Sequence, residues 1–442
     1  MSSIRVIRSA ELPAGFFSVR RLSGDTHEVP VILDAVRTHG DAGIREYAAK
    51  YDRANPVRLE IDRDSLRLAA ESLQRDNPEL YAALVHSREL ALAFARRQRE
   101  SFDDFDMEIA PALVTGQRTV PVERAGIYVP AGRFPLFSSV IMGSVPAQAA
   151  GVDEVILCTP PAPHPSDPAL PWADERIMAV AFICGLDRVF AVGGAQAIGA
   201  MAYGTETLPR VNVIVGPGNK YVAAAKKAVY GEVGIDLLAG PTEVMVIADG
   251  SANPRWVAAD LLAQAEHDPD AEPVLLTVDE RLARAVAAEV DTLVAALPDR
   301  APARASFAKN GLVVLVRDWA EAAEIANRKS PEHLELSLES GPERDALERA
   351  VRNYGSLFVG HRSAEVLGDY AGGLNHTLPT SGSAAFTGGL SVRHFLKTVT
   401  VLRSPDGARD FSGWRRSIAT ARVLAEAEGL SGHALAARCR EE

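Results

Sequence analysis

From Arg124 onward, short runs of β-forming residues alternate with Gly- or Pro-containing loops and Ala-rich stretches of helical composition. The runs cover residues 126–129, 154–158, 188–192, 211–215, 243–248, 273–278, 311–316 and 355–360. This alternation is typical of βαβ units, which place parallel strands in a sheet covered by helices. The pattern therefore predicts an α/β fold, in which ligands bind beyond the carboxyl ends of the strands.

Residues 28–105 instead have the apolar spacing of amphipathic helices and little sheet of their own. We therefore expect the early helices to pack on the later α/β region, with a Rossmann-like block inserted between them. A long helix over 411–428 and a short one capped by Ser431 are predicted near the C-terminus. The expected division is an N-terminal segment (1–27), a discontinuous main α/β domain (28–127 and 241–385), an inserted cofactor domain (128–240) and a C-terminal segment (386–442).

The composition argues against several classes of protein. The chain has 442 residues and a net charge of -11, without the clustered Lys and Arg that nucleic-acid binding requires. No apolar span is long enough to cross a bilayer, and the N-terminus lacks the apolar region of a signal peptide. We therefore expect a cytoplasmic protein with no nucleic-acid or membrane partner. Cys158, Cys184 and Cys439 are too few and too scattered for a disulfide framework or a cysteine-based zinc site.

Three loops that follow predicted strands are rich in Gly: residues 128–133, 193–197 and 216–221. None of them has the G-x-G-x-x-G spacing of a standard dinucleotide site. Glycines before a helix still let the backbone approach a phosphate near the positive end of the helix dipole. Tight turns without any ligand have the same composition, so both interpretations stay open at this point.

Residues 253–269 carry two potential metal ligands at helical spacing. Asn253 is expected to cap a helix that begins at Pro254 and stops before the proline at the end of the segment. Gln264 and His267, three residues apart, then project together near the last turn. The alternative is structural: a histidine that partners the carbonyls at the helix end, beside a solvated glutamine.

Other polar side chains recur in later segments. Glu332 and His333 are adjacent, and Asp369, Tyr370 and His376 decorate a Gly-rich loop. Glu428 and His433 lie close together near the C-terminus. A mixed nitrogen and oxygen set suited to zinc would comprise Gln264, His267, Asp369 and His433. Taken singly, each of these residues is explained more simply by a structural role.

Several longer motifs occur in a fixed order along the chain. They read Gly-Gly-Ala-Gln-Ala (193–197), Gly-Pro-Gly-Asn (216–219), Ala-Gly-Pro-Thr-Glu-Val (239–244), Leu-Leu-Ala-Gln-Ala-Glu-His (261–267), Pro-Glu-His-Leu-Glu-Leu (331–336), Gly-Asp-Tyr (368–370), Asn-His-Thr-Leu-Pro-Thr (375–380) and Glu-Gly-Leu-Ser-Gly-His (428–433). Together they resemble the histidinol dehydrogenase family, from about residue 30 to the C-terminus.

The resemblance implies two incomplete Rossmann-like parallel-sheet domains with small helical N- and C-terminal segments, and a homodimer with shared active sites. It implies zinc held by Gln264, His267 and Asp369, with His433 supplied by the partner chain. The substrate, a small amino alcohol, would contact the side chains at Thr242, Glu332, His333, Tyr370, His376 and the partner's Glu428, together with the metal ligands. The nicotinamide cofactor would be contacted at Tyr128, Gln196 and Asn219.

The chemistry of such an oxidation agrees with these residue types. Converting a primary alcohol to an acid requires a base, a hydride acceptor used twice, and a water that hydrates the aldehyde. The intrinsic pKa of His333 suits it to remove the hydroxyl proton, and Glu332 can activate the water. No cysteine is placed to form a thioester, so a hydrated aldehyde is expected. We therefore expect zinc-dependent, NAD-linked oxidation of L-histidinol to L-histidine through L-histidinal, as in histidine biosynthesis.

Two departures leave the substrate open. Thr242 stands where the family usually has Ser, and residues 131–137 and 387–392 also look like relatives that oxidise sulfopropanediol. Arg133 could meet a sulfonate there, or equally cofactor phosphate or water. A sulfopropanediol dehydrogenase of the same fold is therefore the alternative. A zinc hydrolase in which Glu332 activates metal-bound water is a second one, although a hydrolase has no need of the Gly-rich nucleotide loops.

Overall fold

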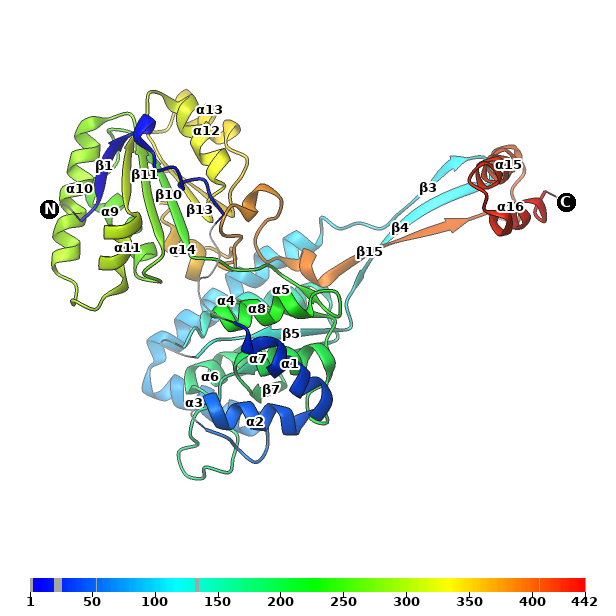
Figure 1. Ribbon diagram of the computed structural model, residues 1–442, viewed down its shortest axis with the longest axis horizontal. Helices are drawn as coiled ribbons and strands as arrows, with labels where there is room; N and C mark the ends of the chain where they lie inside the picture. The colour runs from blue at the N-terminus through cyan, green and yellow to red at the C-terminus, as the bar shows by residue number, and fades with distance from the viewer. Residues whose placement is uncertain (1–2, 20–25, 53, 132–134, 405, 442) are drawn as a thin grey trace. The chain divides into compact units, whose positions relative to one another are not determined.

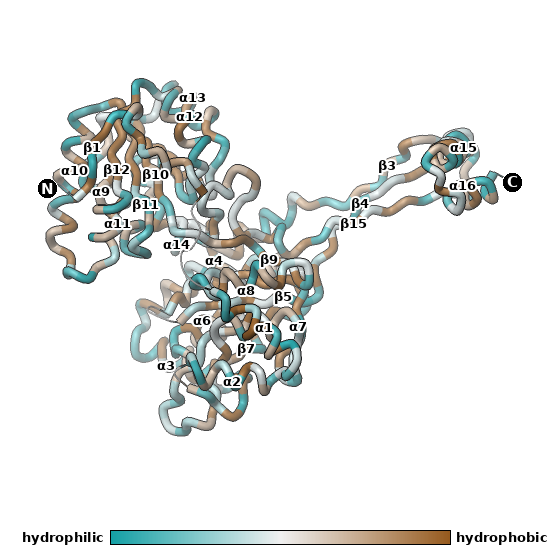
Figure 2. Tube along the Cα trace, viewed as in Figure 1, coloured by the Kyte–Doolittle hydropathy of each residue, from teal (hydrophilic) through white to brown (hydrophobic). Residues whose placement is uncertain are grey.

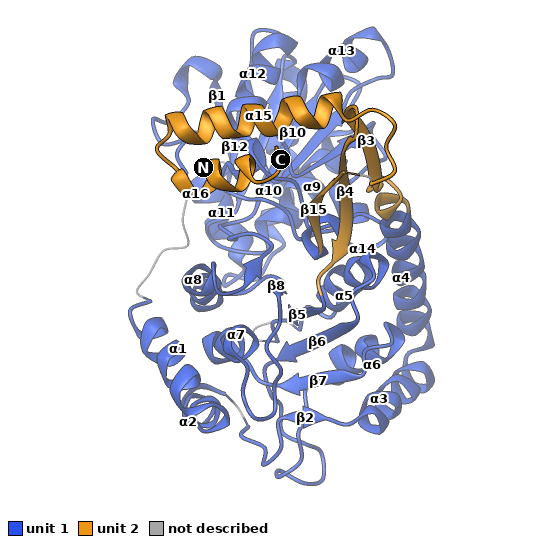
Figure 3. Cartoon of the chain, turned by 90° about the vertical axis from the view of Figure 1, so that its right-hand side faces the viewer, with its two compact units in different colours: residues 1–96, 123–395 blue, residues 97–122, 396–442 orange. Residues whose placement is uncertain are grey.

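The computed structural model describes residues 3–19, 26–52, 54–131, 135–404 and 406–441. The chain forms two compact units, one of residues Met1–Arg96 and Glu123–Phe395 and one of Arg97–Val122 and Leu396–Glu442, coloured separately in Figure 3. The first unit holds two mainly parallel sheets, which confirms the predicted α/β class. Across the described ranges, no helix has the length and apolar character that a bilayer crossing requires.

The first sheet, here called sheet A, is wholly parallel. Its strands lie in the order β1 (Arg5–Arg8), β12 (Leu312–Leu315), β11 (Glu272–Thr277), β10 (Glu243–Ala248), β13 (His333–Ser337) and β14 (Ser356–Val359). Strand β10 comes first along the chain after β1, and later strands add on both of its sides. The switch point of this doubly wound order therefore lies between β10 and β13.

Helices cover both faces of sheet A because its central strands are apolar on both sides (Figures 1 and 2). Val244 and Val246 face a layer of α9, α10 and α11, whereas Met245 and Ile247 face α12 and α13. The bounds are α9 (Pro254–Ala265), α10 (Glu280–Ala295), α11 (Pro302–Asn310), α12 (Trp319–Lys329), α13 (Pro342–Ala350) and the short α14 (Glu365–Tyr370). Strand β13 has its apolar Leu334 and Leu336 on the α12 side only.

The second sheet, sheet B, repeats the doubly wound order with one antiparallel edge strand. Its strands are β2 (Glu60–Ile61), β7 (Arg188–Ala191), β6 (Glu154–Thr159), β5 (Arg124–Tyr128), β8 (Val213–Val215) and β9 (Gly234–Ile235). The switch point lies between β5 and β8. The helices that accompany it are α1 (Glu28–His39), α2 (Asp41–Tyr51), α3 (Arg63–Asp76), α4 (Pro78–Arg99), α5 (Ser138–Ala150), α6 (Glu175–Ile183), α7 (Gly194–Tyr203) and α8 (Lys220–Val229).

The early helices differ from the expected domain division. Helix α1 packs against α7 and α8, α2 packs against α7, and α3 packs against α6, so residues 28–76 help to cover sheet B rather than sheet A. Strand β1, from the expected N-terminal segment, instead joins sheet A beside β12. The amphipathic pattern identified these elements correctly, but an apolar stripe does not specify which sheet it covers.

The first of the early helical segments is divided at Gly40, which has φ +55° and separates α1 from α2. A positive φ is easily adopted by Gly and ends the first helix there. Helix α4 begins at Pro78, and the Asn77 side chain accepts the Leu80 N–H at 3.0 Å.

The second unit is built around an antiparallel sheet that the sequence did not predict. Strand β4 (Leu113–Pro121) lies between β3 (Phe105–Ala110) and β15 (Leu396–Arg403). Two helices follow, α15 (Ser412–Ala427) and α16 (Ser431–Arg438). Short 3-10 turns occur at Ser9–Glu11, Ser383–Ala385 and Val392–Phe395, all in the first unit.

Candidate functional site

The candidate acid–base residues lie at the amino ends of the strands of sheet A. Thr242 immediately precedes β10, Glu332 precedes β13, and His333 is the first residue of β13. Helix α9 starts after the carboxyl end of β10 and returns, so Gln264 at its end reaches the same amino edge. The rule that ligands bind at carboxyl ends therefore does not describe this part of the site.

The carboxyl edge of sheet A is occupied differently. The His361 Nδ1 and Nε2 atoms lie 2.9 Å and 3.1 Å from the hydroxyls of Ser337 and Ser251, and Asp249 accepts the Glu339 N–H at 3.0 Å. These hydrogen bonds connect the loops after β10, β13 and β14. The side chains at this edge thus satisfy one another.

Helix α9 begins as predicted and ends early. The Asn253 side chain accepts the Arg255 N–H at 2.9 Å, and Pro254 is the first helical residue. The helix stops at Ala265, and the His267 N–H donates to the Gln264 carbonyl at 3.3 Å in a tighter turn. Tightening of the last turn is a common way to satisfy orphan carbonyls at a helix end. Gln264 is consequently buried, while His267 is exposed.

Glu332 is a buried carboxylate held by several donors. Its Oε2 accepts the hydroxyl hydrogen of Thr242, the Glu243 N–H at 3.0 Å and the side-chain amide of Gln264 at 3.3 Å. Burial raises the pKa of Glu332, although the neighbouring His333 and the Thr242 hydrogen bond oppose that shift. The methyl group of Thr242 does not prevent this contact. Thr242 therefore donates the same hydrogen bond to Glu332 that a serine at this position would donate.

The two ring nitrogens of His333 have different surroundings. Nδ1 lies 3.3 Å from the Glu243 carbonyl oxygen, to which it can donate, and 3.3 Å from the side-chain amide nitrogen of Gln264, from which it can accept. Nε2 has no hydrogen-bond partner among the described residues and faces Oδ1 of Asp369 at 3.6 Å and Oε2 of Glu365 at 3.8 Å. These separations are those of ion pairs rather than hydrogen bonds. Nε2 is therefore the ring nitrogen that is open to a ligand.

The site carries an excess of negative charge. Burial lowers the pKa of His333, but Asp369, Glu332 and Glu365 outweigh burial and raise it to about 10. Burial also raises the pKa of Glu365 to about 8. Such a collection of carboxylates around one imidazole is an environment that a bound cation would neutralise.

Several buried atoms around His333 have no hydrogen-bond partner among the described residues. They are Gln264 Oε1, Asp369 Oδ1, Glu365 Oε2, Glu243 Oε2 and His333 Nε2. An unpaired buried polar atom costs free energy, so such a group of them indicates a ligand from outside the chain. The site is thus incomplete in its own hydrogen bonding.

The donor set fits a divalent metal ion. Gln264 and Asp369 offer unpartnered oxygens, and His267 and His376 are close enough to help lower the pKa of Asp369 against its burial. Nitrogen and oxygen ligands of this kind suit zinc and similar ions. Within the described ranges no three His, Cys, Asp or Glu side chains are grouped so that they could hold a metal ion by themselves.

The remaining substrate candidates border the same edge. Asp369 and Tyr370 end α14, with Asp369 buried and Tyr370 about half exposed. His376 Nε2 lies 3.3 Å from the Ser138 hydroxyl at the start of α5, and Asn375 donates to the Met142 carbonyl at 2.7 Å. These contacts attach the loop after α14 to a helix of sheet B. Burial lowers the pKa of His376.

Glu428 and His433 belong to the second unit, unlike the other candidates. Glu428 follows α15 and His433 lies in the first turn of α16, and both are exposed. The residue before α16 is Leu430, so Ser431 begins the helix and does not cap it as predicted. Arg133, the proposed sulfonate contact, lies outside the described residues.

The three cofactor candidates lie at the carboxyl edge of sheet B. Tyr128 ends β5 and Asn219 precedes α8, on either side of the switch point, while Gln196 lies in the first turn of α7. The Tyr128 hydroxyl accepts the Gly194 N–H at 3.1 Å, and Gln196 donates to Asp52 at 3.3 Å. Burial raises the pKa of Asp52 to about 6 and also raises that of Tyr128.

Side-chain exposure separates these three residues. Tyr128 and Gln196 are buried, whereas Asn219 is exposed and its Oδ1 accepts the backbone N–H groups of Tyr221 and Val222 at 3.0 Å and 3.2 Å. Asn219 therefore already serves as the N-cap of α8. A ligand at this edge of sheet B would therefore contact the backbone amides at the start of α8 and the exposed N-terminal end of that helix.

Gly216 makes the close turn between β8 and α8. Its φ is +117°, and an added Cβ would overlap the Tyr128 carbonyl oxygen. Gly216→Ala is therefore expected to destabilise the first unit by about 2–4 kcal/mol, from backbone strain plus the overlap. Urea unfolding measures the loss. Gly231→Ala is the control, since Gly231 has φ +105° but open space around it, and an equal loss in both variants would mean that overlap contributes nothing.

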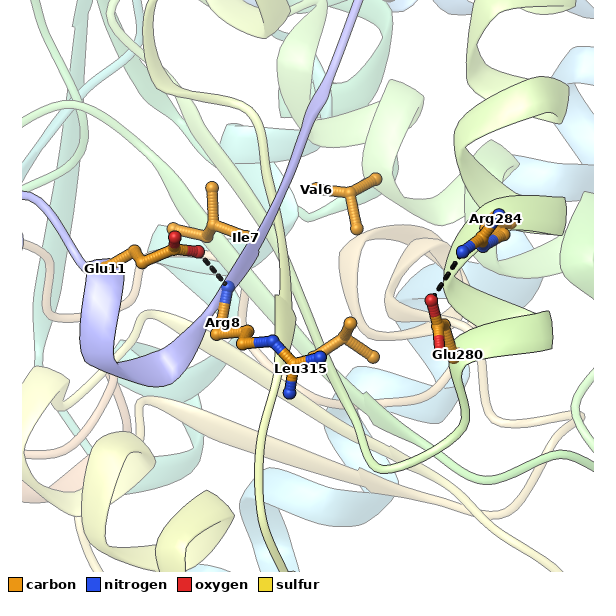
Figure 4. A pocket seen from close by; sticks show the side chains of 7 residues that line it. All are labelled: Val6, Ile7, Arg8, Glu11, Glu280, Arg284 and Leu315. Atoms are coloured by element: carbon orange, nitrogen blue, oxygen red, sulfur yellow. Dashed lines mark hydrogen bonds and ion pairs between the residues drawn. The ribbon is translucent and has the colours of Figure 1, made fainter.

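Two hollows on the first unit include none of the candidate residues. One of 370 Å³ adjoins β1, β12 and the start of α10 (Figure 4), where Arg284 is paired with Glu280 at 2.5 Å. The other, of 640 Å³, adjoins the amino ends of β5, β8 and β9. The candidate site is instead identified by its buried polar groups.

Sequence reasoning missed several residues that contact the site. Glu243, Glu365, Glu335 and Asp260 were not singled out, although Asp260 is four residues before Gln264 and Glu365 is four before Asp369. Residues four apart on a helix share a face. Residues two apart on a strand share a side of the sheet, and His333 and Glu335 are such a pair. This spacing relative to the identified residues could have pointed to the missed ones.

Comparison with known proteins is consistent with this geometry. The family profile described as histidinol dehydrogenase matches residues 20–441. The histidinol dehydrogenase of Thermus thermophilus is 47% identical over 97% of this chain and 98% of its own, and that of Methylococcus capsulatus is 44% identical over 94% and 92%. A crystal structure of histidinol dehydrogenase from Elizabethkingia anophelis matches with a TM-score of 0.89 and 31% identity, covering 100% of this chain and 98% of the other. The chain is an oxidoreductase and belongs to the histidinol dehydrogenase family.

Proposed function

We propose that the protein oxidises L-histidinol to L-histidine through L-histidinal, with two hydride transfers to NAD and with zinc. The observation that carries this proposal is the buried His333, whose unpartnered Nε2 faces the unpartnered Asp369 Oδ1 beside Gln264. The proposed base, His333, thus lies next to two of the proposed metal ligands, Gln264 and Asp369. Membership of a dehydrogenase family argues against the zinc hydrolase considered above.

His333 removes the alcohol proton through Nε2 in the first oxidation. Glu332, next to it, takes a proton from the water that adds to the aldehyde and passes it to the former carbonyl oxygen, and the Thr242 hydroxyl orients that carboxylate. His333 then removes the hydroxyl proton of the hydrated aldehyde in the second oxidation. Each oxidation transfers one hydride and releases one proton, and ionisation of the acid releases a third.

Zinc is assigned to Gln264, His267 and Asp369, together with His433 of the partner subunit. When bound, the ion orients the nitrogen and oxygen atoms of the amino alcohol. The chain's own part is to hold these ligands at the ends of α9 and α14, next to His333. Tyr370, His376 and the partner's Glu428 are assigned to the substrate.

NAD is assigned to the carboxyl edge of sheet B. The switch point between β5 and β8, the backbone turn at Gly216 and the free end of α8 support this location. Asn219 lies at that edge, beside Tyr128 and Gln196 in the neighbouring loops. The hydride acceptor and the base thus come from different sheets of one unit.

A homodimer is supported by the second unit. Among its described residues, apolar side chains remain exposed along β3 and on the two helices: Phe105, Met107, Ile109, Val423, Leu424, Leu430 and Leu435. In a single chain α15 buries only Ala425 among its described residues. An apolar surface of this kind typically covers another protein surface. We assign it to a second copy, which also brings His433 and Glu428 to the shared site.

The test is to count NADH formed per alcohol consumed. Zinc-loaded protein with NAD is expected to produce two NADH for each L-histidinol, which requires both oxidation steps. Sulfopropanediol is the comparison substrate. If only sulfopropanediol is oxidised, the proposed two-step oxidation stands but L-histidinol is not the substrate. If neither alcohol is oxidised, the proposed function is wrong.

Removal of a metal ligand is expected to abolish metal and activity together. Asp369→Ala and His267→Ala should each lose bound zinc and reduce kcat by at least about 10²-fold, because the substrate is no longer oriented. Zinc content by elemental analysis and the rate of NADH formation are measured side by side. Glu266→Gln, at an exposed carboxyl beside His267, is the control and should retain both. Retention of zinc in Asp369→Ala would show that the ligand set is misassigned.

A further inference from the structure

A buried ion pair holds the turn between β8 and α8. Lys226, in the second half of α8, is paired with Asp236, the residue that follows β9, and their side chains are 4% and 0% exposed. Long side chains on a helix point back towards its N-terminal end. The Lys226 ammonium group accordingly reaches the Gly216 carbonyl, ten residues earlier, at 2.9 Å. The pair therefore contacts the start of the loop that leads into α8.

Both backbone polar groups of Gly216 are bound by this pair. The Gly216 N–H donates to Asp236 Oδ2 at 2.8 Å, while the Gly216 carbonyl accepts from Lys226. The other carboxylate oxygen, Oδ1, accepts from the Lys226 ammonium group and from the Leu237 N–H at 2.6 Å. Further back in the sheet the backbone supplies the bonds, since the Asp236 N–H donates to the Ile214 carbonyl at 3.3 Å. Side chains thus continue the pairing where the ladder between β8 and β9 ends.

Gly216 is confined on a second side by the end of β5. An added Cβ at Gly216 would overlap the Tyr128 carbonyl oxygen, so the two backbones are in close contact. Glycine by itself permits a wide range of backbone angles, and its neighbours must therefore select the φ of +117° that turns the chain into α8. The Lys226–Asp236 pair makes this selection, because it binds the groups on both sides of the glycine Cα.

Stability alone does not explain a buried ion pair at this position. The desolvation of two charges offsets most of their attraction, and apolar side chains of similar volume are often as stabilising or more so. Direct attraction of a cofactor phosphate is not its role either, because Asp236 neutralises the charge of Lys226 and both side chains are buried. The contribution that remains is geometric: the pair fixes the backbone of the loop before α8.

We propose that Lys226 and Asp236 are positioning residues for the nicotinamide cofactor. They hold Gly216, and with it residues 217–219 and the N-terminal end of α8, in the arrangement that binds the cofactor. The proposal rests on the proposed function, which assigns NAD to this edge of sheet B. Both residues act through Gly216, because their polar atoms are bound to it and to each other. A loop that is already ordered loses less conformational freedom when its ligand binds.

Asp236→Asn is the first test, because asparagine keeps the volume of the side chain but offers one acceptor oxygen instead of two. The Kd for NAD, measured by titration calorimetry, and the KM for NAD are each expected to rise about tenfold or more. The KM for the alcohol and kcat at saturating NAD should stay close to the wild-type values, because the candidate base His333 belongs to sheet A. The substitution also leaves Lys226 with an unbalanced charge, so direct attraction of cofactor phosphates would lower the Kd for NAD instead.

Lys226→Met is the second variant, and it removes the donor to the Gly216 carbonyl. The Kd for NAD should rise as in Asp236→Asn. Lys227→Met, at an exposed position on the same helix, is the matched control and should bind NAD as the wild type does. Gly231→Ala controls for a general loss of stability, since it strains the backbone before β9 while an added Cβ there meets no other atom within 4 Å. Its Kd for NAD should also be that of the wild type.

An unchanged or lowered Kd for NAD in Asp236→Asn would overturn the proposal, as would an equal rise in Gly231→Ala. Melting temperatures establish that each variant is folded where binding is measured. If a single variant unfolds because it leaves a buried charge unpaired, Lys226→Met/Asp236→Leu replaces it: this variant has neither charge, lacks both bonds to Gly216 and should still bind NAD weakly. A wild type that binds no NAD rejects the proposed cofactor site, whereas variants that bind NAD as tightly as an active wild type reject only the positioning role.

Discussion

Replacing His333 with asparagine is expected to lower kcat by about 10²–10⁴-fold, the usual contribution of a positioned general base. The substitution removes Nε2, the unpartnered ring nitrogen, while asparagine can still donate to the Glu243 carbonyl that Nδ1 faces. Zinc content should stay at the wild-type level because His333 is not among the assigned ligands. Steady-state rates and elemental analysis of the same preparation measure both effects.

His361→Asn is the matched control for this experiment. His361 follows β14 at the carboxyl edge of sheet A, opposite to the edge of His333, and its two nitrogens lie 2.9 Å and 3.1 Å from serine hydroxyls. Its replacement should leave kcat close to that of the wild type. If His333→Asn also turns over at nearly the wild-type rate, the base is another residue and the mechanism proposed above is wrong.

Replacing Lys329 with methionine is expected to lower the free energy of unfolding by about 3–5 kcal/mol, as when one partner of a buried ion pair is removed. Lys329 is 5% exposed at the end of α12. Its ammonium group is paired with Glu272 at the start of β11, and it lies 3.6 Å from Glu243 at the start of β10. Methionine fills a similar volume but leaves two buried carboxyl groups without their cation.

The loss should depend on pH in a defined direction. Burial raises the pKa of Glu243 to about 7, although Lys329 opposes that shift, so removal of Lys329 raises it further. A carboxyl group whose pKa is higher in the folded than in the unfolded protein favours folding at low pH, and this contribution is lost as the pH rises through the folded pKa. Lys329→Met should therefore be more destabilised at pH 8 than at pH 6 in urea unfolding.

An exposed ion pair of the same kind provides the control. Lys309 is paired with Asp270, and these side chains are 62% and 35% exposed. Lys309→Met should cost less than about 1 kcal/mol because water already solvates both charges. The double variant Lys329→Met/Glu272→Gln should recover part of the loss by removing one of the two buried negative charges that Lys329 neutralises. Equal losses for Lys329→Met and Lys309→Met would contradict the argument from burial.

Local features of the fold could be predicted from the sequence. The predicted strand at 243–248 has the bounds found for β10, and Asn253 with Pro254 marks the start of α9. These signals depend on a few neighbouring residues: a run of apolar β-formers, or a side chain that accepts a nearby backbone N–H. The three-stranded sheet of the second unit could not be predicted in this way, because β4 pairs with β15, which is almost 280 residues later.

The candidate site was predicted in part. The sequence and the family resemblance identified three of its residues: the adjacent Glu332 and His333, and Gln264 near the end of a helix. The structure brings these residues together with Thr242 and Asp369. Glu365, Glu335 and Asp260 were not identified. A carboxyl group is ordinarily solvated, and only the packing of α9 and α14 near β13 buries Glu365 and Glu335 and partly buries Asp260.

The sequence by itself determined the main helices and strands of the first unit, that its central strands are parallel, and which residue types are available for chemistry. It did so because hydrogen bonding within a turn and the periodicity of apolar residues are local properties. Only the tertiary structure decided that residues 28–76 help to cover sheet B and that the candidate site lies at the amino edge of sheet A. These outcomes depend on which apolar surfaces bury one another, and burial is non-directional and acts between segments far apart in the chain.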